Sequence, residues 1–101
     1  MTVYMIKEML TAKKSGNKTL HIIGKEEQYL SFSLDRNAKP GDEFKMICKN
    51  LSQIERHANL YGYTNKSFCQ KKMDKYITKN IRIPHPIYDF EYEVIELDID
   101  D

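Results

Sequence analysis

Two short segments with alternating side-chain character constrain the fold of this chain more than any other feature. In residues 29–34, Leu30, Phe32 and Leu34 alternate with a tyrosine and two serines, and in residues 90–95 aromatic or apolar side chains alternate with two glutamates and an isoleucine. A period of two places successive side chains on opposite faces of a sheet. We therefore expect a strand at each segment, the second within a final strand at residues 87–99.

The other expected strands depend on turns and short apolar runs. Residues 18–34 form a predicted hairpin, because an apolar run at residues 20–23 precedes a Gly-containing turn and the alternating segment. The turn at residues 39–42 contains Pro40-Gly41 and leads to a third predicted strand at residues 44–49, with a helix as the competing interpretation. Residues 2–14 fit a helix slightly better than one arm of a hairpin.

Two consecutive helices are predicted between this third strand and the last one. Ser52 with Glu55, and Ser67 with Gln70, have the spacing of capping boxes, and either Thr64 or Ser67 is expected to open the second helix. Gly62 is expected to end the first helix in a left-handed conformation, and the prolines at 84 and 86 stop the second. The expected fold class is α+β: a small antiparallel sheet of three to four strands, the last from the C-terminal segment, packed against an α-hairpin, with an N-terminal helix as an option.

Length and composition indicate one globular domain over residues 1–101, with an acidic tail that frays at about residues 98–101. No apolar run approaches the roughly 18 residues that a membrane span needs, and the first ten residues do not resemble a signal peptide. We therefore expect a cytoplasmic protein without a membrane partner. The usage of Lys, Asn, Ile and Tyr is common in proteins from AT-rich genomes, which include those of many phages and mobile elements.

The charge of the chain is divided between two regions. Residues 1–82 contain all 16 Lys and Arg and 8 of the 15 acidic residues, a net charge of +8, whereas residues 83–101 contain the other 7 acids and no Lys or Arg. Such asymmetry indicates a charged partner.

The cations are densest in the second predicted helix, where aromatic residues lie among them. Lysine and arginine neutralise phosphates, and aromatic rings stack on bases, so this segment predicts nucleic-acid binding by a small non-enzymatic regulatory protein. The competing interpretation is an ordinary solvated helix face. The candidate nucleic-acid-binding residues are Tyr63, Lys66, Gln70, Lys71, Lys72, Lys75, Lys79 and Arg82.

The two predicted helices also partly match a helix-turn-helix motif. Ala58 and Gly62 have the spacing of the small residue and the turn glycine of that motif. His57 and Lys71 occupy positions where apolar residues belong, which departs from the pattern. If the motif forms, the helix from Ser67 is the recognition helix; otherwise the pair is an ordinary α-hairpin.

The acidic segment supports an alternative function. An inhibitor or adaptor protein, of the kind that phages direct at host defence, would place it on the basic channel of a nucleic-acid-processing enzyme. The candidate protein-binding residues are Asp89, Glu91, Glu93, Glu96 and Asp98. The last strand also offers an edge through which a homodimer could form.

The chain offers little for catalysis or metal binding. Its two cysteines, Cys48 and Cys69, are expected to be free and buried, and with His57 and His85 they match no compact zinc signature. No nucleophile has a base and an orienting group, and no glycine-rich phosphate loop exists. We therefore expect no enzymatic activity, no metal and no cofactor.

Overall fold

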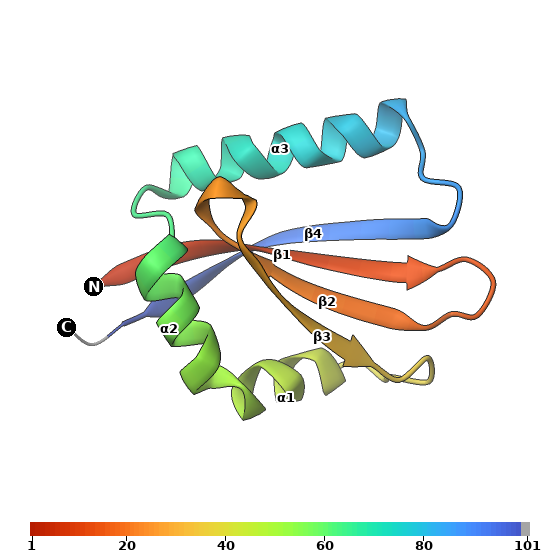
Figure 1. The fold of residues 1–101 in the computed structure, drawn as a ribbon, viewed down its shortest axis with the longest axis horizontal. Helices are drawn as coiled ribbons and strands as arrows, with labels where there is room; N and C mark the ends of the chain where they lie inside the picture. Colours follow the sequence, from red (N-terminus) through yellow and green to blue (C-terminus); the bar gives the residue numbers. More distant parts are fainter. Residues whose placement is uncertain (100–101) are drawn as a thin grey trace.

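A four-stranded antiparallel sheet separates helix α3 on one face from helices α1 and α2 on the other (Figure 1). The computed structural model describes residues 1–99, and the strand order is β3-β2-β1-β4. The main elements are β1 (Thr2–Ala12), β2 (Lys18–Ile23), β3 (Tyr29–Leu34), α1 (Asp42–Lys49), α2 (Leu51–Tyr61), α3 (Lys66–Arg82) and β4 (Tyr88–Asp98), with a single 3-10 turn at Lys25–Glu27. This confirms the α+β class and the C-terminal strand.

Strand β1 lies in the interior of the sheet and is buried on both faces. Met5 and Met9 pack towards α1 and α2, whereas Ile6 packs towards α3. The prediction of a helix at residues 2–14 is therefore wrong, and the hairpin alternative is right. A strand that is covered on both sides has apolar residues at odd and even positions, so its sequence lacks the alternation that identifies a half-buried strand.

The face under α1 and α2 holds the larger core cluster, with Ile54 and Ala58 of α2 against β1. Residues 44–49, predicted as a strand, belong to helix α1, which has no fully buried residue and exposes Phe44. Lys7 of β1 joins α1 to β4 through ion pairs with Glu43 and Glu93. Burial lowers the pKa of Lys7, but its hydrogen bonds to these carboxylates outweigh that effect and raise the pKa overall.

The opposite face is covered by α3, whose Cys69 and Met73 pack on Ile6. Helices α2 and α3 therefore lie on different faces of the sheet, and neither the expected pairing of these two helices nor the helix-turn-helix motif is formed. The connection passes around the end of the sheet, where Tyr63 pairs with Tyr4 as an isolated bridge. Gly62 has φ −66° and ψ 146°, so it is extended rather than left-handed.

The first residues of the chain and residues 98–99 lie side by side where β1 pairs with β4. Thr2 is opposite Asp98, and the amide of Ile99 donates to the carbonyl of Met1 at 2.7 Å. Ile99 is buried, so residues 98 and 99 are not the frayed tail that we expected; residues 100 and 101 lie outside the described part. No helix in residues 1–99 has the length and apolar character to cross a membrane.

Candidate nucleic-acid interface

Helix α3 begins at an asparagine cap. The Asn65 side chain accepts a hydrogen bond from the Phe68 amide at 3.1 Å, whereas the predicted cap, Ser67, lies inside the first turn. Seventeen residues follow before Ile83, a length of about 25 Å. The helix is therefore as long as the basic segment of the sequence.

The inner side of α3 fixes which residues face outward. Cys69 and Met73 are buried, and Tyr76 and Ile77 are half-buried against the sheet. Burial raises the pKa of the Cys69 thiol to about 11, so this cysteine stays protonated and unreactive at neutral pH. Burial also raises the pKa of Tyr76 to about 12.

The outer side of α3 carries the predicted cations. Lys71, Lys75 and Lys79 recur every fourth residue and therefore lie along one stripe of the helix. Within residues 1–99, the ion pairs are Lys7–Glu43, Lys7–Glu93 and His21–Glu8, and none involves α3. The acidic strand thus does not neutralise the basic helix. The exposed cations of α3 are Lys66, Lys71, Lys75, Lys79 and Arg82, with Lys72 partly exposed.

Two other residues of the predicted interface have different environments. Gln70 is exposed and donates to the Asp74 carboxylate at 3.2 Å. Tyr63 is only 3% exposed and its hydroxyl points to the Gly24 carbonyl, so its ring cannot stack on a base, and this residue is removed from the interface. Phe68, at 61% exposure, is the ring that α3 presents to solvent.

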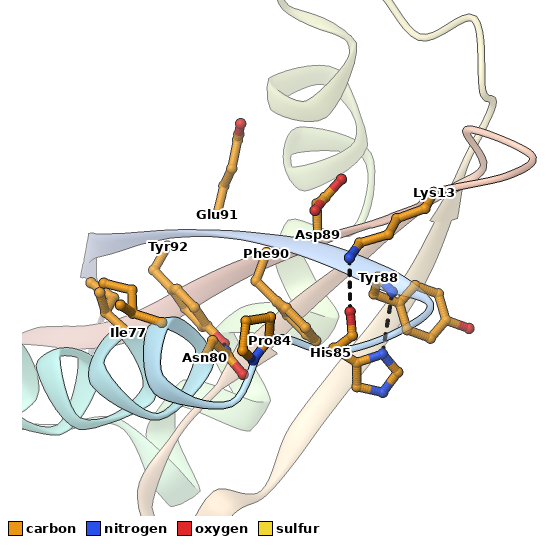
Figure 2. A pocket seen from close by; sticks show the side chains of 11 residues that line it. Lys13, Ile77, Asn80, Pro84, His85, Tyr88, Asp89, Phe90, Glu91 and Tyr92 are labelled. Atoms are coloured by element: carbon orange, nitrogen blue, oxygen red, sulfur yellow. Dashed lines mark hydrogen bonds between the residues drawn. The ribbon is translucent and has the colours of Figure 1, made fainter.

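The five predicted acidic residues are all exposed on β4, but they divide between the two faces of the sheet. Asp89 and Glu91 point away from α3, as Figure 2 shows, and Glu93 shares their face. Glu96 and Asp98 have the opposite parity and lie on the α3 face. The acidic segment is therefore two small groups and not one continuous acidic surface.

A polar cluster that the sequence did not reveal lies on the α3 face. Glu8, 9% exposed, accepts from the Tyr92 hydroxyl at 2.6 Å and contacts the His21 Nδ1 at 2.8 Å. Asn80 of α3 donates to the same Tyr92 hydroxyl, and Tyr76 stacks on the Tyr92 ring. Burial and the hydrogen bond to Glu8 raise the pKa of Tyr92. Both Glu8 oxygens are satisfied, so the cluster joins three strands to α3.

A groove of about 670 Å³ separates the C-terminal half of α3 from β4 (Figure 2). Ile77, Ile81 and Pro84 form one wall, and residues 88–92 of β4 form the other. His85 accepts hydrogen bonds from the amides of Ile87 and Tyr88, which shapes the loop between the two walls.

The residues considered for a metal site have different environments in the structure. Cys69 of α3 is buried as expected, whereas the expectation of a buried Cys48 is wrong, since this residue is exposed on α1. His57 contacts the Gln28 carbonyl at 3.1 Å. The part of the chain that the structure describes has no group of three or more His, Cys, Asp or Glu arranged to hold a metal ion.

Comparison of the chain with protein-family models, with curated proteins and with solved structures gives no significant match.

Proposed function

We propose that the chain is a small non-enzymatic regulatory protein that binds nucleic acid through the outer stripe of α3. The observation that carries the proposal is the row of exposed cations on α3, which has no carboxylate partner within residues 1–99. When Lys and Arg side chains contact phosphates, they release counterions from the nucleic acid, which favours binding at low salt.

The aromatic residues of this region favour a duplex over a single strand. Single-strand binding uses successive exposed rings on which bases stack. Here Tyr63 is buried and Tyr76 packs on Tyr92, which leaves Phe68 as the exposed ring of α3. The helix is thus equipped mainly for phosphate contacts, which position a protein on a duplex without reading its sequence.

The test is a fluorescence titration of the protein with a labelled 20-base-pair DNA duplex at several salt concentrations. If five cations contact phosphates, the slope of log K against log salt is about −4 to −5, since each contact contributes about −0.9. The variant Lys71→Gln/Lys75→Gln/Lys79→Gln should reduce the magnitude of this slope by about 3. The matching single strand should bind more weakly.

A control variant removes the same charge from the other face of the molecule. Lys45 and Lys49 of α1 and Arg56 of α2 are exposed on the side of the sheet opposite α3. Their triple replacement by Gln should leave the slope unchanged. The proposal fails if no duplex binds at low salt, or if both triple variants weaken binding equally.

A further inference from the structure

Strand β4 has a long free edge. It pairs with β1 on one side only, and its register with β1 is unbroken from Tyr88 to Asp98. The strand contains no proline or bulge, which are devices that commonly prevent an edge from pairing with another chain. This edge can therefore accept a further strand.

The hydrogen-bond pattern shows which backbone groups are free. The Lys13 amide donates to the Ile87 carbonyl, and Met1 and Ile99 exchange hydrogen bonds, so the odd-numbered residues of β4 are bonded to β1. Bonded and non-bonded pairs alternate in an antiparallel ladder. The amides and carbonyls of the even-numbered residues, including Phe90 and Tyr92, therefore point away from the sheet.

The groove between α3 and β4 lies beside this strand. Its lining includes residues 88–92 of β4, and the Phe90 and Tyr92 side chains point toward α3, whereas Lys13 lines it from the β1 side (Figure 2). Ile81, which lines the groove, is 72% exposed, and Ile83, the first residue after α3, is 73% exposed. Exposed apolar residues beside an unpaired edge indicate a surface for another chain.

The charges of β4 decide what kind of chain fits. Asp89, Glu91 and Glu93 occupy the face of the edge that points away from α3, and β4 contains no Lys or Arg. Glu93 is neutralised in part by Lys7, whereas Asp89 and Glu91 have no ion pair within residues 1–99. Two β4 strands paired together would place acids beside acids, which is destabilising.

We propose that β4 binds an extended basic segment of a partner protein by strand addition. The segment pairs its backbone with the even-numbered residues from 88 to 92. Its alternate side chains are Lys or Arg, next to Asp89 and Glu91, and the side chains between them are apolar and enter the groove against Ile77 and Ile81. Strand addition provides affinity through the backbone and specificity through alternate side chains. This surface is separate from the outer stripe of α3 and goes beyond the proposed function.

The test begins with selection of a random twelve-residue peptide display library against the full chain, followed by synthesis of the tightest binder. We expect alternating basic and apolar residues in the selected sequences. Hydrogen exchange by NMR then reports the geometry: the amides of Phe90 and Tyr92 should slow at least about tenfold on binding, whereas those of Glu91 and Glu93, already bonded to β1, should change little.

Paired variants separate the groove from general charge effects. Glu91→Lys and Ile81→Asp should each weaken peptide binding at least about tenfold. Their controls are Glu96→Lys, on the other face of β4, and Leu60→Asp, at an equally exposed site on α2; both should bind within about twofold of the original chain.

Several results would overturn the proposal. These are selection that yields no binder, selected peptides without the alternation, equal binding by Ile81→Asp, or unchanged exchange at Phe90 and Tyr92. A free protein that sediments as a dimer with those two amides already protected would show that the occupant is a second copy of the chain.

Discussion

At the scale of single residues, close packing decides positions that a sequence pattern assigns to something else. Gly62 has the spacing of a helix-closing glycine, yet its backbone is extended. What requires glycine is space: a Cβ added there would lie 2.8 Å from the Val3 Cβ and would also collide with the Ala58 carbonyl. The glycine thus allows the end of α2 to lie directly on β1.

The hydroxyl of Tyr92 gives a prediction of pH-dependent stability. Its pKa is raised above the ordinary value of 10.0, so the folded state holds this proton more tightly than the unfolded chain. The stabilisation is fully present below pH 10 and is lost as the pH rises beyond it. Tyr92→Phe should lower the free energy of unfolding by about 1–3 kcal/mol at pH 7, because Glu8 loses a hydrogen-bond donor.

Urea unfolding at pH 7 and at several values above 10 measures this effect. The difference in free energy of unfolding between the original chain and Tyr92→Phe should shrink as the pH rises. The reason is that the Tyr92 hydroxyl ionises first in the unfolded chain, which stabilises the unfolded state of the original chain alone. Tyr63 and Tyr76, whose pKa values are also raised, are present in both chains and cancel. A difference that is constant with pH would contradict the assigned role of Tyr92, and Tyr29→Phe, at an exposed ring, is the control.

At the scale of elements, the sequence reveals a segment when one face of it is exposed. The hairpin of β2 and β3, helix α2, helix α3 and strand β4 are predicted close to their observed bounds. Strand β1 is missed because it is covered on both faces, and α1 because eight residues with alternating apolar positions resemble a strand. Local patterns also do not indicate which face of a sheet a helix covers. For this reason the predicted packing of α2 against α3 is wrong.

The candidate sites also differ in whether a local sequence pattern can predict them. The cations of α3 can be identified in the sequence, because the exposure of these lysines depends only on their positions along the helix. The Glu8 cluster is not, because it requires the register that places Glu8 between His21 and Tyr92. The groove is hidden for the same reason, since its walls come from residues 77–84 and from a strand whose neighbour is β1.

The N-terminus of α3 provides a prediction at this scale. Asn65→Ala should lower the free energy of unfolding by about 1 kcal/mol, because the Phe68 amide loses its side-chain acceptor. Ser67→Ala, at the cap that the sequence pattern suggested, should change it by less than about 0.5 kcal/mol. Thermal or urea unfolding of the two variants decides between the caps, and a larger loss for Ser67→Ala would contradict the observed one.

At the scale of the whole molecule, the order of strands departs from the order of the chain. Strands β3, β2 and β1 are neighbours both in the sheet and along the chain, but β1 also pairs along its whole length with β4. Even the pair that is closest in sequence, Ala12 and Tyr88, is 76 positions apart. Contacts between such distant segments slow folding because a long loop must close first.

A circular permutant tests this argument. Joining the two ends by a short Gly/Ser linker and opening the chain between Arg36 and Asn37, in an exposed turn, makes β4, β1, β2 and β3 consecutive. The permutant should refold faster than the original chain in stopped-flow experiments while keeping its circular dichroism spectrum. An equal or slower refolding rate would show that β1–β4 pairing does not limit folding.

The pairing of β1 with β4 also has a consequence during protein synthesis. The strand at residues 88–98 leaves the ribosome after every other element described here, so β1 has one side unpaired while residues 13–87 are synthesised. During that interval β1, with its apolar residues on both faces, is open to chaperones and to neighbouring nascent chains. Only when the acidic strand emerges does the sheet gain its fourth member, and the groove between α3 and β4 exists only from that moment.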